Sequence, residues 1–368
     1  MDAAEPSYGF RRLHALLSRR SPIGSILESP CTRFVPEHGA GRDHGRLVSK
    51  PHFATMPTSC VVIPTYNRVD TLLRCLAHLQ AQTYKEFEVV IVDDGSTDDT
   101  PALVERYKAK APFPLRYIRQ RNSGPARARN VAIAQSGAEL TVMIGDDILA
   151  MPDFVERHIE FHAQHPGENV VAIGLTRWCE DGQTVTNFMR WLDADGIQFG
   201  FGSLLAGRKP DWHDFYTSNM SFKTSYLQAH PFDETFPGAG YEDLELGLRL
   251  KRRHDLQLDF FPSALAEHLH PTDFMRSCRR MQDVGGSAYI LKQRWPEFGE
   301  FPTLPPSRRR VFELLSRPGL LFALSHAARA LTGICCPNPL TRRVLNIHGR
   351  VGYDRAAAKH ASNDKPAA

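Results

Sequence analysis

The chain of 368 residues is long enough for one large α/β domain with appendages or for two small domains. Its apolar content of 42% and charged content of 23% are ordinary for a globular protein, and a net charge of +4 gives no reason to expect a nucleic-acid partner. A run of about 18 apolar residues, as a membrane-spanning helix needs, does not occur in the sequence. The cysteines are odd in number and lack a Cys-x-x-Cys pair, which favours a reducing compartment, so we expect a cytoplasmic location.

Residues 1–55 are rich in Arg, His, Pro, Ser and Gly and carry no sustained hydrophobic period beyond a short helical pattern around residues 10–17. A segment of this composition buries too little apolar surface to offset the entropy lost on ordering. We therefore expect a disordered N-terminal extension, followed by a folded domain that begins near residue 56.

From residue 59 onward, short apolar runs alternate with segments that carry apolar residues at helical spacing. Alternating strands and helices of this length indicate a parallel sheet with right-handed crossovers. Strands are predicted at 60–63, 89–92, 115–118, 140–144, 170–175 and 258–261. Helices are predicted at 69–82, 100–108, 125–134, 154–164, 240–250 and 273–295.

Polar clusters follow three of these strands at the point where each one ends: residues 64–67, the pair Asp93-Asp94 and the pair Asp146-Asp147. Ligands bind at the carboxyl ends of the strands in such sheets. Two adjacent buried carboxylates repel each other unless a cation stabilises them, and Mg²⁺ or Mn²⁺ does so while phosphate oxygens fill its remaining positions. The alternative is an acidic turn that caps the next helix.

Two common nucleotide-binding motifs are missing. There is no G-x-G-x-x-G after the first strand and no G-x-x-x-x-G-K-[ST] anywhere, which disfavours a dinucleotide cofactor and a P-loop triphosphatase. Residues 119–130 instead place four arginines beside a glycine and a helix start, and both features suit phosphate. The alternative is that Arg127 and Arg129 are solvated helix residues, which we expect less for Arg129.

Four segments stand in an order and spacing that resembles the family 2 glycosyltransferases: VVIPTYNR, VVIVDDGSTDDT, NSGPARARNVAIAQSGAEL and VMIGDDILAMPD. The resemblance covers residues 59–295 and implies a GT-A fold, a nucleoside-diphosphate-sugar donor and inversion at the anomeric carbon. The site residues it implies are Pro64, Tyr66 and Asn67 with Asp94 at the nucleotide, Arg129 near the base or diphosphate, Asp146 near the ribose or sugar, and Asp147 on Mg²⁺ or Mn²⁺. Many members carry Asp-x-Asp here; this chain has Gly145 at the first position and keeps the last carboxylate, the usual metal ligand.

The acceptor half carries a second acidic cluster, Glu242, Asp243 and Glu245, in the first turn of a predicted helix. Helix capping alone is one explanation, because carboxylates complement the helix dipole. The resemblance implies a general base here, with Asp243 in that role and Glu242 or Glu245 orienting it. It also implies a histidine near the metal, His268 or alternatively His270, although a core or surface histidine is the other explanation.

Two regions leave alternatives open. Residues 178–207 contain aromatics, among them Phe188, Trp191, Phe199 and Phe201, that either line an acceptor groove or, as we expect more, pack onto the sheet. In the tail, Arg308, Arg309 and Arg310 precede an apolar helix candidate at 319–334, so that 307–334 either lies peripherally at the inner face of a membrane or packs on the domain. We expect disorder after Tyr353. The residues 293–295, QRW, lack the Gln-x-x-Arg-Trp spacing of processive members, so processive synthesis is not expected.

The sequence thus predicts an α/β protein of GT-A type, with a Rossmann-like, mostly parallel central sheet between helices. We expect the domain to span 56–300, with a nucleotide-binding half (56–153) and an acceptor half (154–300), before a helical extension (301–368). The predicted function is metal-dependent inverting transfer to a glycan or lipid-linked hydroxyl acceptor, in surface polysaccharide, glycolipid or cell-wall glycan synthesis. The alternatives are a catalytically silent nucleotide-sugar-binding or scaffold protein, and a sugar nucleotidyltransferase, which would need a glycine-rich, basic loop after the first strand.

Overall fold

The structure, a computed structural model, describes residues 59–363 except 195–196, 237, 239, 298–300, 302–303, 335 and 337. Contacts divide the chain into two units, Met1–Met56 and Pro57–Ala368, and all described residues belong to the second. The extension expected at 1–55, with its short helix, therefore lies outside the described residues.

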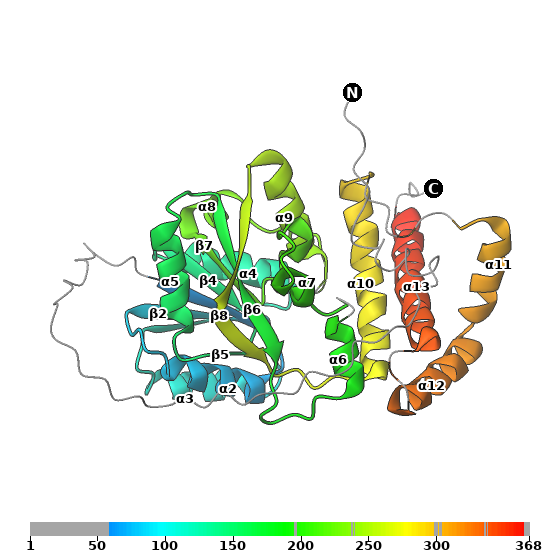
Figure 1. Cartoon of the computed structure of the whole chain (residues 1–368), viewed down its shortest axis with the longest axis horizontal. Helices are drawn as coiled ribbons and strands as arrows, with labels where there is room; N and C mark the ends of the chain where they lie inside the picture. The colour runs from blue at the N-terminus through cyan, green and yellow to red at the C-terminus, as the bar shows by residue number, and fades with distance from the viewer. Residues whose placement is uncertain are drawn as a thin grey trace. The chain divides into compact units, whose positions relative to one another are not determined.

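The first half of the domain is a parallel sheet, as predicted (Figure 1). The order of its strands is β3-β2-β1-β4. Its strands are β1 (Ser59–Thr65), β2 (Phe87–Asp93), β3 (Leu115–Arg119) and β4 (Leu140–Ile144), and its helices are α2 (Val69–Gln80), α3 (Thr100–Lys108) and α4 (Pro125–Gln135). Alternate residues of β1 and β2, such as Val62 and Val90, pack against Ala128 and Ala132 of α4 in one buried cluster.

The second half makes the sheet mixed. β7 (Asn219–Lys223) runs antiparallel to both β4 and β6 (Val170–Trp178), β6 pairs in parallel with β8 (Gln257–His268), and β5 (Ile148–Ala150) runs antiparallel to β8. The prediction missed β5 and β7 and ended β8 seven residues before His268. β7 alternates polar and apolar residues over only five positions, and its polar residues are buried as well: Asn219 and Ser221 hydrogen-bond to His158 on α5.

The remaining elements of the domain are helices, of which those at 154–164 and 224–229 pack against strands of the mixed half of the sheet. They are α5 (Phe154–Gln164), α6 (Asn187–Ala194), α7 (Phe201–Leu205), the 3₁₀ turn η1 (Trp212–Asp214), α8 (Thr224–Ala229), α9 (Glu242–Arg253) and α10 (Phe274–Arg294). The segment 178–207 thus forms two short helices. The expected packing onto the sheet is confirmed for Phe201 and the partly buried Phe199, whereas Phe188 and Trp191 pack against α10 and tail residues instead.

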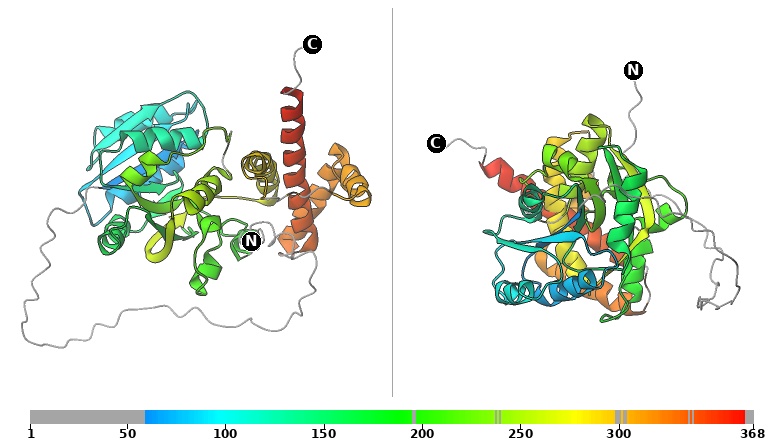
Figure 2. Two further views of the ribbon diagram at one scale, coloured as in Figure 1. Left: turned by 90° about the horizontal axis from the view of Figure 1, so that it is seen from above. Right: turned by 90° about the vertical axis from the view of Figure 1, so that its left-hand side faces the viewer.

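The tail is helical, as predicted: α11 (Pro306–Leu315), α12 (Pro318–Ile334) and α13 (Pro339–Asn363). The disorder expected after Tyr353 is wrong, because α13 continues to Asn363 through an alanine-rich stretch that favours helix. α13 packs closely on α10: a Cβ added at Gly352 would lie 1.9 Å from the carbonyl oxygen of Gln282 (Figure 2). Among the described helices, none has the length and apolar character needed to span a membrane.

Candidate functional site

The carboxyl edge of the parallel strands gathers the first set of site residues. Thr65, the last residue of β1, donates its hydroxyl to Asp146 Oδ2 at 2.8 Å. The guanidinium of Arg68 lies 3.0 Å from Asp146 Oδ1 and 2.7 Å from Asp147 Oδ2. The loops after β1 and β4, which are about eighty residues apart in sequence, therefore meet in one charged cluster.

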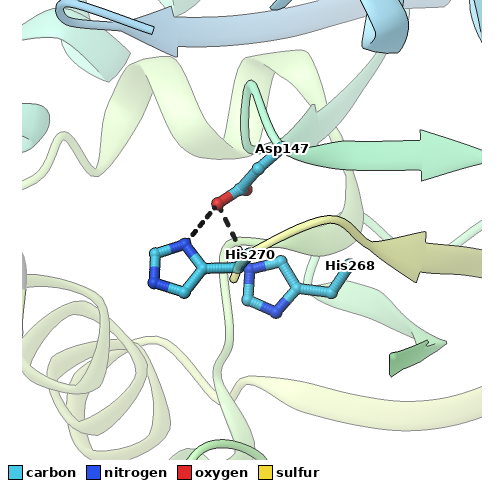
Figure 3. A group of neighbouring side chains, drawn as sticks. All are labelled: Asp147, His268 and His270. Carbon is cyan, nitrogen blue, oxygen red and sulfur yellow. Dashed lines mark hydrogen bonds and ion pairs between the residues drawn. The ribbon is translucent and has the colours of Figure 1, made fainter. Parts of the chain in front are cut away.

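Asp147 and two histidines form a compact group of metal-ligating atoms, all within 4.8 Å of one another (Figure 3). The antiparallel register pairs Ile148 with His268, and this brings the end of β8 next to Asp147. Nε2 of His268 lies 3.2 Å and Nδ1 of His270 3.1 Å from Asp147 Oδ2. Both histidines that the sequence offered as alternatives therefore reach the same carboxylate.

These residues fit a divalent cation. Burial opposes ionisation of Asp147, but His268, His270 and Arg68 together hold its pKa well below the usual range, so it stays an anionic ligand. Burial lowers the pKa of His270, which keeps its imidazole neutral and able to coordinate. One carboxylate with two imidazoles suits a transition metal such as Mn²⁺ better than Mg²⁺, which prefers oxygen ligands.

Asp243 stands at the start of α9, next to Tyr241, which takes a left-handed backbone with φ of 71°. Burial raises the pKa of Asp243 to about 7; the neighbouring Glu242 raises it further and Arg129 opposes the rise. Its Oδ1 accepts a hydrogen bond from the backbone N–H of Leu244 at 2.9 Å. Asp243 thus combines a local capping contact with a carboxyl group whose pKa suits proton transfer near neutral pH.

Comparison with known families assigns the parallel half of the domain and part of the mixed half. The model of the family described as glycosyl transferase family 2 matches residues 60–229. The chain carries a glycosyl transferase family 2 domain. The match includes the loops that hold Arg68, Asp146 and Asp147, and it ends before Asp243 and His268.

Individual relatives agree with the family 2 assignment. Validoxylamine A glucosyltransferase of Streptomyces hygroscopicus subsp. jinggangensis is 31% identical over 230 residues, which cover 53% of this chain and 51% of that protein. Poly(ribitol-phosphate) beta-N-acetylglucosaminyltransferase TarS of Staphylococcus aureus is 37% identical over 89 residues, or 24% of this chain and 16% of TarS. The chain spans about half the length of the first of these relatives, so the similarity describes the domain and not the whole relative.

A solved structure shows the same fold. The mannosyltransferase PcManGT from Pyrobaculum calidifontis, in complex with GDP-Man and Mn²⁺, aligns with a TM-score of 0.50 at 18% identity. The alignment covers 85% of this chain and 89% of PcManGT. The predicted GT-A fold is therefore confirmed, with a helical region after the core domain.

Several predicted nucleotide-binding residues of the family 2 domain hold its loops in place. Asp94 accepts hydrogen bonds from the backbone N–H groups of Ser123 and Gly124, both at 2.8 Å, and so fixes the turn before α4. The side-chain oxygen of Asn67 accepts a hydrogen bond from the backbone N–H of Thr97 at 2.6 Å, and the backbone of Asn67 itself is left-handed. Tyr66 is 45% exposed, so its ring is open to a ligand. Nucleotide contacts of Tyr66, Asn67, Asp94 and Pro64 stay predictions.

Arg129 has a partner that the sequence did not predict. Its Nη1 lies 2.8 Å from Glu242 Oε1 in a nearly buried ion pair, and the other oxygen of Glu242 accepts from the N–H of Gly240 at 2.6 Å. The pair joins α4 of the nucleotide half to the start of α9, beside Asp243. Glu245 bonds to Arg249 instead, which leaves Glu242 as the neighbour that acts on Asp243. By contrast, Arg127 is exposed and pairs with Glu234, as the solvated alternative predicted.

Aromatic rings connect the histidines to the Asp243 side of the site. Trp178 stacks on His268 with ring centroids 5.3 Å apart, and Phe199 lies 5.5 Å from the same imidazole. Phe199 also contacts Tyr216 at 5.4 Å, and the charge of Asp243 acts on the hydroxyl of Tyr216. Trp178, Tyr216 and Arg68 were not predicted as site residues, and Thr65 was placed in the polar cluster at 64–67 without a role of its own. For Arg68, its place inside the PTYNR segment was an available signal.

The carboxyl group of Asp146 is bound by two neighbouring side chains, which the sequence did not predict. Burial raises its pKa to about 7, while the charge of Arg68 opposes this shift and that of Asp147 adds to it. Thr65 and Arg68 occupy both carboxyl oxygens. A contact of Asp146 with ribose or sugar stays a prediction.

Proposed function

We propose that this chain is a metal-dependent inverting glycosyltransferase, which moves a sugar from a nucleoside diphosphate to a hydroxyl acceptor. The observation that carries the proposal is Asp243, a half-buried carboxyl group with a pKa of about 7, which Tyr216 and Phe199 connect to a divalent-cation ligand set in a family 2 domain. The silent-scaffold alternative gives no reason for such a carboxyl group.

The reaction needs one proton acceptor on the acceptor's side of the sugar. The acceptor hydroxyl oxygen forms a bond to the anomeric carbon as the bond from that carbon to the diphosphate oxygen breaks. The hydroxyl proton passes to the carboxylate of Asp243, and the electron pair of the broken bond leaves with the diphosphate. Because attack and departure occur on opposite sides of the carbon, the anomeric configuration inverts.

Asp147 with His268 and His270 would hold the metal, which when bound supplies positive charge to the leaving diphosphate. Mn²⁺ in the PcManGT complex supports this choice of ion. Tyr66, with its open ring, would pack on the base, while Asp94 and Asn67 keep the surrounding loops in shape. The nucleoside-diphosphate sugar of PcManGT supports the donor class.

Thermal-shift measurements test the donor class. We expect the melting temperature to rise when one of UDP, GDP or TDP is added, and to rise further when Mn²⁺ is added with that nucleotide. A ligand that binds only the folded state stabilises it by mass action. At about 100 times the dissociation constant the gain is about 2.7 kcal/mol. No shift with any nucleotide, with or without Mn²⁺, would contradict the proposed donor and support the scaffold alternative.

The pH profile tests Asp243 as the base. Because the carboxyl group must be ionised to accept a proton, we expect kcat/KM to fall as the pH drops through about 7. Glu242→Gln removes a neighbouring negative charge and should move this acidic limb of the pH profile to lower pH. Arg129→Gln removes a positive charge and should move it to higher pH. Shifts in the same direction would show that another group controls the limb.

We further propose that the tail holds the enzyme on an anionic membrane, close to a lipid-linked or glycan acceptor of surface polysaccharide, glycolipid or cell-wall synthesis. α11 has no buried side chain, and its Val311 and Leu314 are exposed, as is Phe322 of α12 at 65%. Residues 301–363 carry ten Arg and Lys residues against two acidic ones. Exposed apolar side chains among arginines fit an interface of apolar chains and anionic headgroups.

Flotation with vesicles of phosphatidylcholine and phosphatidylglycerol tests this attachment. We expect the chain to float with these vesicles and to stay at the bottom of the gradient with phosphatidylcholine alone. Phe322→Asp with Leu314→Asp should abolish flotation, because the charges oppose insertion of this surface. Leu205→Asp is the matched control, since Leu205 is a 59% exposed leucine outside the tail. Equal flotation of all variants would contradict the proposal.

A further inference from the structure

Arg68 occupies the centre of the charged cluster although no part of the proposed reaction uses it. It directly precedes α2, and its side chain is 34% exposed. Nη1 lies 3.0 Å from Asp146 and Nη2 lies 2.7 Å from Asp147, so the guanidinium bridges the two adjacent carboxylates. This arrangement offsets the cost of burying two like charges side by side.

The same guanidinium lies where a metal ion would need its ligands. Nη2 is 2.7 Å from Asp147 Oδ2 and 3.1 Å from His270 Nδ1, which are two of the three candidate ligand atoms. A divalent cation binds through the lone pairs of these atoms. The cation cannot take both ligand atoms while Nη2 stays in contact with them, because like charges at that distance repel strongly.

We propose that Arg68 is an intramolecular cation that holds the site when metal is absent and that a divalent metal must displace. The inference rests on the metal site of the proposed function and adds a competitor to it. The displaced guanidinium remains on the loop after β1, at the edge where the donor's diphosphate would lie, and phosphate oxygens can accept both of its N–H groups. Metal and nucleoside diphosphate therefore bind cooperatively: the metal releases Arg68 and the diphosphate gives it a new partner.

Titration with Mn²⁺ alone, followed by electron paramagnetic resonance, tests the competition. We expect Arg68→Met to bind Mn²⁺ more tightly than the unaltered chain, by about tenfold or more, because no ion pair has to break. UDP or GDP should tighten Mn²⁺ binding in the unaltered chain and much less in Arg68→Met. Arg74→Met is the matched control: Arg74 lies on α2, pairs with exposed Asp181 and should leave Mn²⁺ affinity unchanged.

A second variant and a second readout separate competition from a purely structural role. Arg68→Lys keeps one charge but cannot bridge two carboxylates, so its Mn²⁺ affinity should fall between those of the other two forms. In chelator, Arg68→Met should melt below the unaltered chain, and Mn²⁺ should restore its melting temperature. Unchanged or weaker Mn²⁺ binding in Arg68→Met would overturn the competition while leaving the metal site standing. If no form binds Mn²⁺, with or without nucleotide, the metal site of the proposed function fails as well.

Discussion

Replacing Asp243 with asparagine should abolish sugar transfer while donor binding persists. The amide has the shape of the carboxylate but cannot accept a proton, and a positioned general base contributes about 10²–10⁴-fold to a rate. We expect kcat to fall by that factor, measured as product formed at saturating donor, with the dissociation constant of the nucleoside diphosphate unchanged. The asparagine oxygen can still accept the N–H of Leu244, so the start of α9 should remain intact.

Asp283→Asn is the matched control for this variant. Asp283 is an exposed carboxylate on α10, and its loss should leave kcat unchanged. Full activity of Asp243→Asn would show that Asp243 is not the general base, and Glu242 would become the next candidate for that role. If donor binding is lost together with kcat, the residue would belong to the donor site and not to proton transfer.

The parallel half of the sheet was predictable because β1, β2 and β4 contain short runs of buried, mostly apolar residues that end in polar ones. The strand ends then placed Asp94 and Asp146 at one edge without any knowledge of contacts. The mixed half was less accessible. β5 has only three residues, and β7 carries two buried polar residues whose partners on α5 are about sixty positions away.

Side-chain partners across long sequence separations account for what was missed in the site. The sequence suggested that Arg129 contacts nucleotide, since it follows a glycine at a helix start, but its partner Glu242 is 113 positions away. Similarly, nothing local to Trp178 or Phe199 shows that they pack on an imidazole about seventy to ninety residues later. The contact of Trp178 follows from the register of β6 with β8, which pairs Trp178 with His268.

Asp147→Asn should remove the effect of Mn²⁺ on donor binding and lower kcat/KM by about 10²-fold or more, since a metal supplies several kcal/mol to the leaving group. A neutral amide is a weaker ligand for a hard cation, and it also weakens the attraction that holds Arg68, His268 and His270 together. The measurement is the UDP or GDP dissociation constant with and without Mn²⁺.

Asp146→Asn is the comparison within the site. Its amide oxygen can still accept the hydroxyl of Thr65, and it is not one of the three clustered ligands, so Mn²⁺ should still tighten nucleotide binding. His268→Gln should weaken Mn²⁺ binding more than His270→Gln, because the His268 side chain is 7% exposed against 30%, and His270 also contacts the competing guanidinium of Arg68. An Mn²⁺ effect that survives in Asp147→Asn but disappears in Asp146→Asn would place the cation on the first carboxylate of the pair, and the two aspartates would exchange roles.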